Sequence, residues 1–362
     1  MVTRILIMAG GTGGHVFPAL AVAQELRARG VEVIWMGTHQ GLEAEIVPRA
    51  GIAMEWININ GLRGKGAASW LLAPFKLVVA LIQSFIILMR CRPMAVLGMG
   101  GFAAGPGGVM TWLLRKPLLI HEQNAIAGLT NRMLARLAVK TMVAFPGALP
   151  AQCKPLVTGN PVRREIIASE IPTTRYKGRP ARLRLLVLGG SQGAQALNEV
   201  VPQAIKRLPE DIRPEIWHQA GAHNIDVTQS IYKESGVSAK VVPFIAAMAE
   251  AYGWADVVLC RAGALTIAEL AAVGVASILV PYPAAADDHQ THNAGYLVQA
   301  NAAILIQQKD LSAEYLGQLL IGFIRPSHAR ALLLEMAVAA RQLAKPDAAQ
   351  RVAALCIEAA HA

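Results

Sequence analysis

Two glycine-rich turns, each between a short apolar run and an expected helix, are the segments of this chain best suited to bind phosphate. The first is Gly10-Gly-Thr-Gly-Gly14, which follows the apolar residues 5–9, and the second begins at Gly189-Gly190, which follows residues 185–188. A strand, a glycine turn and a helix together present backbone N–H groups and the positive end of a helix dipole, which attract phosphate. Because the turns lie about half the chain apart, they predict two nucleotide-binding domains that face each other across a cleft.

A histidine follows the first turn directly. His15 stands at the start of a helix, where the helix dipole disfavours the imidazolium form. A neutral imidazole accepts a proton near pH 7, so we interpret His15 as a candidate general base beside Thr12, Gly13 and Gly14. The alternative is a histidine that only caps the helix or packs against it.

A dinucleotide cofactor is the other ligand that such a turn commonly holds. A nicotinamide site needs Asp or Glu at the end of the second strand, where the carboxylate binds the ribose. Here that strand ends Trp35-Met-Gly-Thr38 and carries no acid. We therefore expect no cofactor.

Another glycine cluster follows the strand expected over residues 95–99. Residues 98–108 contain six glycines, among them Gly100 and Gly101. Their N–H groups would form a further anion-binding turn at the same sheet edge as the first. The alternative is a flexible connection without a ligand.

The next strand ends in His121-Glu-Gln-Asn124, at the sheet edge where ligands bind in doubly wound folds. Glu122 is the only acid between residues 56 and 164. The sequence leaves two interpretations open for this carboxylate: a role in the site, or a structural ion pair with Arg132 or Arg136.

In the second half, residues 260–269 read strand, turn and helix. Thr266 lies at the helix start, where N–H groups can bind a diphosphate. Glu269 follows one turn later, which suits a carboxylate that accepts hydrogen bonds from ribose hydroxyls. The alternative is that Glu269 forms a capping box with Thr266. His289 and His292 lack a third ligand at a suitable spacing, so we expect no metal.

The length and charge set the broad class. A chain of 362 residues with 54% hydrophobic residues predicts about two domains. Residues 56–164 contain thirteen Lys or Arg and one acid, a net charge of +12 in a chain of net charge +10. This asymmetry indicates an anionic surface as partner. The four scattered cysteines are typical of reduced, cytosolic thiols.

The basic residues of that half alternate with apolar runs, which favours a membrane surface over nucleic acid. The apolar run 77–89 is shorter than the roughly 20 residues that span a bilayer, so we expect a helix lying in the interface. A buried core helix is the alternative. No nucleic-acid-binding motif is present, and we expect none to be bound. The expected membrane face comprises Trp70, Leu71, Phe75, Lys76 and Trp112.

Strands and helices alternate through both halves, which predicts two doubly wound α/β domains. We expect residues 1–163 to form an N-terminal Rossmann-like domain that binds the membrane and one of two substrates, the acceptor. Residues 164–335 should form a second Rossmann-like domain, and 336–362 a terminal helix that packs back on the first. The expected strands span residues 5–9, 31–36, 54–59, 95–99, 118–121, 140–144, 156–158, 185–188, 215–219, 240–243, 257–260, 277–280 and 303–306.

Taken in order, these motifs resemble the MurG family of N-acetylglucosaminyltransferases over nearly the whole chain. The resemblance rests on GGTGGHVFPAL at Gly10, GLRGKG at Gly61, GMGGF at Gly98, GPGG at Gly105, HEQN at His121, GLTNR at Gly128, GNPVR at Gly159, GGSQGA at Gly189, CRAGALTIAE at Cys260 and DDHQTHNA at Asp287. Ala276 stands where the family pattern suggests proline, away from the expected chemistry.

The resemblance implies a glycosyltransferase B fold and an inverting transfer of N-acetylglucosamine from UDP-N-acetylglucosamine to undecaprenyl-pyrophosphoryl-N-acetylmuramoyl-pentapeptide (lipid I). The product would be lipid II, a precursor of peptidoglycan, made at the cytoplasmic face of the bacterial inner membrane by a peripheral enzyme. Cell-wall synthesis proteins are possible partners. A UDP-sugar epimerase of the same fold and a non-catalytic nucleotide-binding scaffold remain the alternatives.

Site residues carried over by motif divide between donor and acceptor. The backbone of Ile245 would face the uracil, Glu269 the ribose, and Gln290 and Asn124 the sugar. His15 would act as base, and Gly13, Gly14, Gly100 and Gly101 would hold the acceptor pyrophosphate. The remaining donor contacts would come from Thr12, Gly13, Gly14, Arg163, Ser191, Ala264, Leu265 and Thr266.

Overall fold

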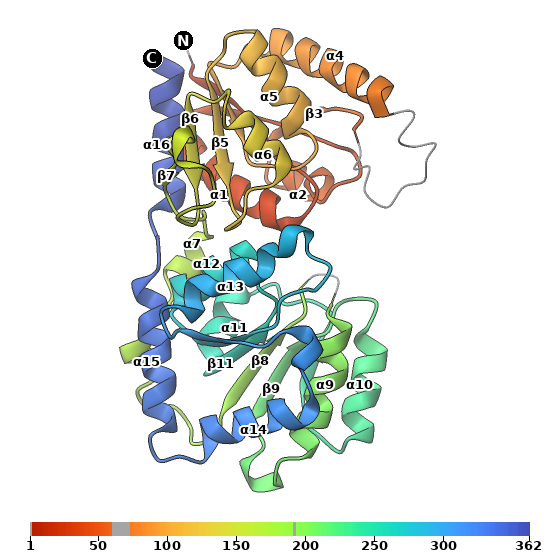
Figure 1. The fold of residues 1–362 in the computed structure, drawn as a ribbon, viewed down its shortest axis with the longest axis vertical. Coiled ribbons are helices and arrows are strands. Elements are labelled where there is room, and N and C mark those ends of the chain that lie inside the picture. The colour runs from red at the N-terminus through yellow and green to blue at the C-terminus, as the bar shows by residue number, and fades with distance from the viewer. Residues whose placement is uncertain (1, 60–72, 191–192) are drawn as a thin grey trace. The chain divides into compact units, whose positions relative to one another are not determined.

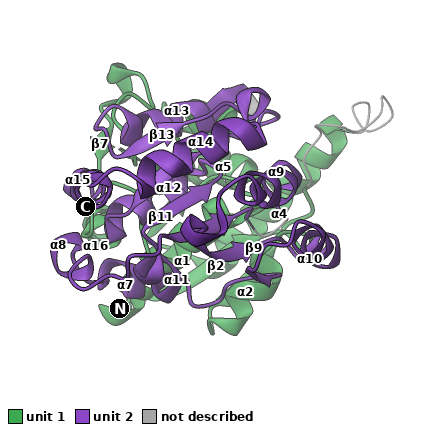
Figure 2. Ribbon diagram, turned by 90° about the horizontal axis from the view of Figure 1, so that it is seen from below, with its two compact units in different colours: residues 1–163, 345–362 green, residues 164–344 purple. Residues whose placement is uncertain are grey.

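The computed structural model describes residues 2–59, 73–190 and 193–362. The chain folds into two compact units, which Figure 2 distinguishes by colour. Unit 1 comprises residues 1–163 and 345–362, and unit 2 comprises residues 164–344. Among the predicted segments, Trp70, Leu71, Ser191 and the GLRGKG motif lie outside the described residues.

Unit 1 is built on a parallel sheet with the strand order β3-β2-β1-β4-β5-β6-β7. Alternate residues of β1 pack into the cores on opposite faces of the sheet, because successive side chains of a strand point to opposite faces. Ile5 and Ile7 pack under α1 and α16, whereas Leu6 and Met8 pack under α4 and α5. Its strands are β1 (Arg4–Met8), β2 (Glu32–Gly37), β3 (Ala53–Trp56), β4 (Ala95–Gly98), β5 (Leu118–Glu122), β6 (Lys140–Val143) and β7 (Leu156–Val157).

Helices cover both faces of this sheet, as Figure 1 shows. The alternating pattern of the sequence also predicts helices over residues 18–29 and 73–89, and both are present, each longer than predicted by a few residues. The helices of unit 1 are α1 (Gly13–Ala28), α2 (Glu43–Arg49), α4 (Ala73–Cys91), α5 (Ala104–Leu113), α6 (Leu129–Leu134) and α16 (Ala348–His361), with a 3₁₀ turn at Ala151–Cys153.

Unit 2 repeats the plan with the parallel order β10-β9-β8-β11-β12-β13. Its strands are β8 (Arg184–Leu188), β9 (Glu215–Gln219), β10 (Lys240–Val242), β11 (Val257–Cys260), β12 (Ala276–Leu279) and β13 (Ala303–Leu305). Its helices are α7 (Arg164–Ile167), α8 (Pro172–Arg175), α9 (Gln195–Lys206), α10 (Ile225–Glu234), α11 (Met248–Trp254), α12 (Ala264–Val273), α13 (His289–Val298), α14 (Ala313–Ile324) and α15 (Ala329–Gln342), with 3₁₀ turns at Glu210–Ile212, Ala286–Asp288 and Gln308–Asp310.

Each sheet has a point where the strand order reverses, between β1 and β4 in unit 1 and between β8 and β11 in unit 2. Ligands of doubly wound folds bind beyond the carboxyl ends of the strands at such switch points. The turns after these four strands are the Gly10 turn, the Gly98–Gly101 turn, the Gly189 turn and the turn before α12. The topology therefore places the predicted glycine turns where a nucleotide-binding fold binds its ligand.

Three predicted boundaries were wrong. The glycine cluster 98–108 is not one loop, because α5 begins at Ala104 and takes Gly105, Gly107 and Gly108 into its first turns. The sequence also predicts a helix over residues 129–138, but in the structure this helix, α6, ends at Leu134. The chain returns to unit 1 at Lys345 rather than at residue 336 because α15, which packs on α12 and β12, continues unbroken to Gln342.

Candidate functional site

The two glycine turns of unit 1 lie in direct contact. A Cβ atom at Gly101, where φ is +85°, would overlap the carbonyl oxygen of Gly10. At Gly100, where φ is +91°, it would lie 2.8 Å from Cε1 of His15. Both positions therefore require glycine, and the structure brings His15, the Gly10 turn and Gly100–Gly101 together at one sheet edge.

A buried carboxylate that sequence reasoning missed supports the first turn from below. Glu43, the first residue of α2, has no exposed surface. One of its oxygens accepts from the N–H of Gly11 at 2.9 Å, and the other accepts from the N–H and the hydroxyl of Thr38 at 3.0 and 2.9 Å. Glu43 thus fixes the conformation of the Gly10 turn, and it occupies the N–H group of Gly11. The first-turn N–H groups of α1 at Gly13 and Gly14 are the ones suited to a phosphate.

The contact between the turns predicts that Gly101→Ala lowers both stability and kcat. The added methyl group would overlap the backbone of Gly10 and push the two turns apart, in addition to the roughly 1–2 kcal/mol that a left-handed backbone costs a residue with a Cβ. Gly147→Ala is the matched control, because its φ is +80° and a Cβ there meets nothing within 4 Å. Thermal unfolding and steady-state kinetics should show a larger loss for Gly101→Ala. Equal losses for both variants would contradict the close contact.

His15 is connected through hydrogen bonds to the end of β5. Its Nδ1 lies 2.9 Å from Oε1 of Gln123, and Nε2 of Gln123 lies 3.2 Å from Nδ1 of His121. On the other side of the His121 ring, Nε2 lies 2.9 Å from the carbonyl oxygen of Gly159. His121 is fully buried, and this burial lowers its pKa to about 4. The alternative that His15 only caps helix α1 does not explain these contacts, because they connect its ring to residues at the end of strand β5.

Glu122 shapes the loop that carries Asn124. One oxygen accepts from the backbone N–H of Asn124 at 2.9 Å and from its side-chain amide at 3.2 Å. The other accepts from the N–H of Gly128 and from the amide of Asn131. Of the two interpretations left open for Glu122, the ion pair with Arg132 or Arg136 is therefore wrong: the carboxylate is buried and bonded to N–H groups, while both arginines are exposed.

Arg163 and Thr12 lie at the same end of unit 1. The guanidinium of Arg163 stands 5.8 Å from the centre of the Phe17 ring, on the first turns of α1. Thr12 is the exposed N-cap residue of that helix, and its side chain makes no capping hydrogen bond. Both residues thus lie beside Gly13 and Gly14, and their contact with the donor stays a prediction.

The glycine turn of unit 2 is tied to the loop that precedes α11. The side chain of Gln219, at the end of β9, donates to the carbonyl of Gly190 at 2.9 Å and accepts from the N–H of Ile245 at 2.9 Å. Ile245 is buried. A uracil at this position would have to replace Gln219 on that N–H or use the Ile245 carbonyl. Gln219 was not identified from the sequence, because nothing in β9 distinguishes it from a buried strand residue.

Helix α12 presents its first N–H groups at Ala264, Leu265 and Thr266, after the N-cap Gly263. Glu269 follows one turn later and is 5% exposed. Its Oε2 accepts from the hydroxyl of Tyr252 at 3.1 Å. The capping-box interpretation of Glu269 is therefore wrong, because Thr266 lies inside the helix and Gly263 is the cap.

The carboxylate of Glu269 also affects the pKa of a nearby cysteine in strand β11. Burial in the first place, and then the negative charge of Glu269, raise the pKa of Cys260 to about 12. A thiol with this pKa stays protonated at neutral pH and is a poor nucleophile. The site thus combines a helix N-terminus with a carboxylate held by Tyr252, and its cysteine is chemically inert.

Gln290 joins the turns that follow β11 and β12. Its Oε1 accepts from the N–H of Ala262 at 3.2 Å and from that of Tyr282 at 2.9 Å. These bonds leave the Nε2 amide of Gln290 as the group that could donate to a sugar hydroxyl. Nδ1 of His292 contacts the carbonyl of Asp288 at 3.1 Å. Across residues 2–59, 73–190 and 193–362, no three His, Cys, Asp or Glu side chains are grouped as metal ligands.

Helix α4 has two apolar faces. One face, with Ala80, Ser84, Ile87, Leu88 and Cys91, packs against the unit 1 core. The other exposes a further set, which together with two residues of α5 we call the α4–α5 face: Phe75, Leu77, Val78, Ile82, Phe85, Ile86, Met89, Trp112 and Leu113. By length and composition α4 is able to span a membrane, but its inner face is committed to the domain. A contiguous exposed apolar surface of this kind indicates an interaction site.

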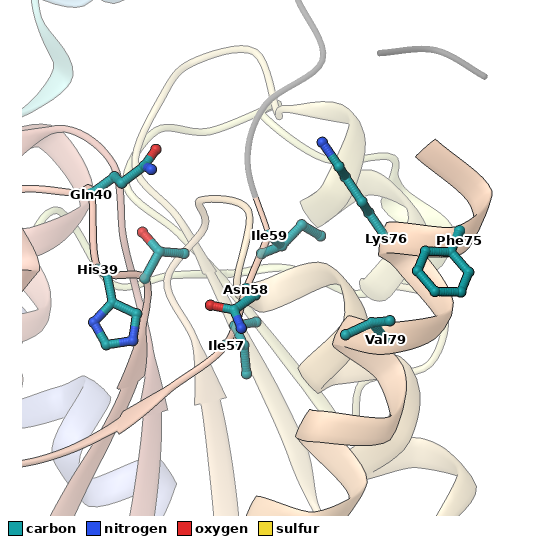
Figure 3. A pocket seen from close by; sticks show the side chains of 9 residues that line it. His39, Gln40, Ile57, Asn58, Ile59, Phe75, Lys76 and Val79 are labelled. Carbon is teal, nitrogen blue, oxygen red and sulfur yellow. The ribbon is translucent and has the colours of Figure 1, made fainter. Parts of the chain in front are cut away.

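A pocket of about 270 Å³ lies beside the first turns of α4. Figure 3 shows His39, Gln40 and Asn58 on the side of strands β2 and β3, and Lys76 and Val79 on the side of the helix. The ring of His39 stacks on Trp56 with centroids 4.4 Å apart. The pocket therefore adjoins the carboxyl edge of the sheet and the α4–α5 face.

Comparison with known proteins agrees with this geometry. Residues 5–143 match the glycosyltransferase family 28 N-terminal domain, and residues 184–352 match the C-terminal domain of that family. The chain is 56% identical over 360 residues to the UDP-N-acetylglucosamine--N-acetylmuramyl-(pentapeptide) pyrophosphoryl-undecaprenol N-acetylglucosamine transferase of Nitrosococcus oceani, with 99% of each chain covered. The corresponding protein of Marinobacter nauticus is 52% identical, with 99% of this chain and 98% of that protein covered.

Solved structures give the same result. The crystal structure of Acinetobacter baumannii MurG is 41% identical, with a TM-score of 0.84 and with 98% of this chain and 99% of that chain covered. A UDP-GlcNAc 2-epimerase from Neisseria meningitidis shares the fold at 12% identity, with a TM-score of 0.66 and with 98% and 100% of the two chains covered. The architecture is thus the expected glycosyltransferase B fold, and the chain belongs to glycosyltransferase family 28 and, within it, to the MurG family.

Proposed function

We propose that this protein transfers N-acetylglucosamine from UDP-N-acetylglucosamine to undecaprenyl-pyrophosphoryl-N-acetylmuramoyl-pentapeptide, with inversion at the anomeric carbon, to form lipid II for peptidoglycan synthesis. The observation that carries the proposal is the sequence identity of 56% and 52%, over 99% of this chain, to two proteins named as transferases for this reaction. The arrangement of α12, Glu269 and Tyr252 supports it, because a helix N-terminus and a buried carboxylate suit a nucleoside diphosphate.

Unit 2 would bind the donor. The N–H groups at Ala264, Leu265 and Thr266 would hold the diphosphate, and Glu269 would accept from the ribose hydroxyls. As the bond between the anomeric carbon and the phosphate oxygen breaks, negative charge develops on the departing UDP. Preorganised N–H donors at a helix N-terminus stabilise that charge. Ser191 is proposed from its motif alone, and Ile245 and Gln290 would contact the base and the sugar.

Unit 1 would bind the acceptor. Its pyrophosphate would lie against the N–H groups of Gly13, Gly14, Gly100 and Gly101. The acceptor hydroxyl attacks the anomeric carbon, and its proton would pass to His15 as the new C–O bond forms. Asn124 and Arg163, at the same sheet edge, would complete the contacts to the transferred sugar and the donor.

The direct test is UDP release from UDP-N-acetylglucosamine. Purified protein should release UDP when the lipid-linked muramoyl-pentapeptide is added, and not without it. Release or interconversion of the sugar nucleotide without acceptor would instead support an epimerase, which shares the fold. Binding of UDP without any turnover would support a nucleotide-binding scaffold.

The α4–α5 face would lie on the anionic cytoplasmic surface of the inner membrane, where the lipid-linked acceptor is held. Its apolar side chains are flanked by exposed cations at Lys76 and Arg115, and such a combination favours anionic interfaces. The protein would bind peripherally, because the opposite side of α4 packs on its own domain. Trp70 and Leu71 belong to this proposal through the sequence only.

Adding two charges to this face should weaken membrane binding. In flotation with anionic vesicles, Phe75→Glu/Ile82→Glu should bind at least about tenfold more weakly, since each carboxylate opposes burial and is repelled by the lipid headgroups. Val227→Glu/Tyr315→Glu, which makes the same charge change at exposed positions of unit 2, is the matched control. Activity on a short-chain acceptor in detergent should stay unchanged. Equal flotation of both double variants would contradict the assignment of the face.

A further inference from the structure

A buried row of hydrogen bonds connects Gly159, His121, Gln123 and His15, and its first atom has a fixed role. The carbonyl oxygen of Gly159 can only accept, and Nε2 of His121 lies 2.9 Å from it. Nε2 of His121 must therefore carry the hydrogen. His121 has no exposed surface, and burial lowers its pKa to about 4, so the ring is neutral near pH 7. A neutral ring with its hydrogen on Nε2 has a bare Nδ1 that accepts.

The orientation of the Gln123 amide follows from this. One end of the amide lies 3.2 Å from the bare Nδ1 of His121 and 3.3 Å from the carbonyl oxygen of the same residue. Both of these atoms accept, so this end must be the NH₂ group. The opposite end is then the amide oxygen, which lies 2.9 Å from Nδ1 of His15. Gln123 is 1% exposed, which leaves little room for another orientation.

An amide oxygen only accepts, so Nδ1 of His15 must donate to it. We propose that Gln123 and His121 are positioning residues that hold His15 in the tautomer with a protonated Nδ1 and a bare Nε2, so that Nε2 receives the proton of the acceptor hydroxyl. The proposal rests on the proposed function, in which His15 is the base. His15 is half-buried, so its ring remains reachable from solvent.

The groups around the row fit a neutral base. Met99, whose sulfur lies 4.0 Å from Nε2 of Gln123, and the backbone of Gly100, which packs against the His15 ring, carry no charge. A carboxylate in place of Gln123 would also orient the ring, but it would favour the imidazolium form. The neutral amide orients the His15 ring through its oxygen and places no negative charge beside it.

The test is the tautomer of His15, measured by NMR on protein with nitrogen-labelled histidine. Protonated and bare ring nitrogens give distinct signals, and the His15 signals among the 9 histidines are those lost in His15→Gln. Wild type should show a protonated Nδ1. Gln123→Met, which keeps the size but removes the hydrogen bonds of the amide to His15 and His121, should lose this preference. Its kcat should fall by about ten- to a hundredfold, less than the whole contribution of a general base, with KM for UDP-N-acetylglucosamine nearly unchanged.

Two further variants separate positioning from general destabilisation. Gln123→Glu retains an acceptor for Nδ1 of His15, so Nδ1 should stay protonated, but the carboxylate favours the imidazolium form, so Nε2 should also become protonated and kcat should stay low. Asn198→Leu is the matched control, because Asn198 is a buried amide in unit 2 that bonds to the neutral His218 at 3.0 Å. It should lower the melting temperature without changing the His15 signals.

The outcomes distinguish this inference from the proposed function. A wild-type His15 with a protonated Nε2, or a Gln123→Met variant with unchanged His15 signals, overturns the positioning role even if His15→Ala is inactive. Conversely, a protonated Nδ1 in wild type together with full activity of His15→Ala would preserve the positioning and remove His15 as the base.

Discussion

His15→Ala should lower kcat by roughly 10²–10⁴-fold, the usual contribution of a general base, and should leave KM for UDP-N-acetylglucosamine nearly unchanged. The reason is that His15 lies in unit 1 beside Gly100, whereas the proposed donor contacts at α12 and Glu269 lie in unit 2. Loss of an interaction made only in the transition state lowers kcat and kcat/KM together. Steady-state kinetics with both substrates varied is the measurement.

Two comparisons keep this result interpretable. His328→Ala removes an exposed histidine of unit 2 and should leave kcat unchanged. The melting temperature of His15→Ala should be close to that of wild type, which shows that the variant is folded, and calorimetry should give the same UDP affinity for both. An unchanged kcat in His15→Ala, with UDP binding intact, would remove His15 from the reaction and leave the base to be found elsewhere.

Glycine turns and strands could be predicted because their determinants are local. Each of the expected strands is present, since a short apolar run bounded by glycine or a polar turn specifies a buried parallel strand without reference to the rest of the chain. The same holds for the turns at Gly10 and Gly100, where positive φ values and close contacts leave room only for glycine.

The residues that support those turns could not be predicted, because their partners are distant in sequence. The side chain of Glu43 bonds to the N–H of Gly11, and that of Gln123, at the end of β5, bonds to His15 near the start of α1. Tyr252 binds Glu269 from another helix. In the sequence each is an ordinary polar residue at an element end, and only the register of the sheet brings it under a turn.

The alternative roles of two acids were wrong for a related reason. Spacing alone left open an arginine partner for Glu122 and a capping role for Glu269. The structure instead surrounds Glu122 with N–H groups and places Glu269 one turn inside α12, against Tyr252. Burial decides the partner in both cases, since a buried carboxylate must be satisfied by the donors that the fold places around it.

Glu269→Ala should raise the dissociation constant for UDP roughly a hundredfold, with a much smaller change in kcat. Hydrogen bonds to a charged acceptor contribute about 1.5–3 kcal/mol each, and a loss of about 3 kcal/mol corresponds to roughly a hundredfold in affinity. The carboxylate is held ready by Tyr252, so Tyr252→Phe should weaken UDP binding by a smaller factor. Isothermal titration with UDP measures the affinities, and steady-state kinetics measures kcat.

The ribose assignment itself is tested with 2′-deoxy-UDP. Wild type should bind UDP more tightly than the deoxy compound, because the carboxylate loses a donor, whereas Glu269→Ala should bind both equally. Glu269→Gln keeps the size of the side chain and one acceptor, so it should fall between the two and also guards against a folding defect at this buried position. If Glu269→Ala still distinguished the two nucleotides, the hydroxyl would be recognised by another group. In that case the buried carboxylate of α12 would have a structural role, and its bond to Tyr252 would be part of it.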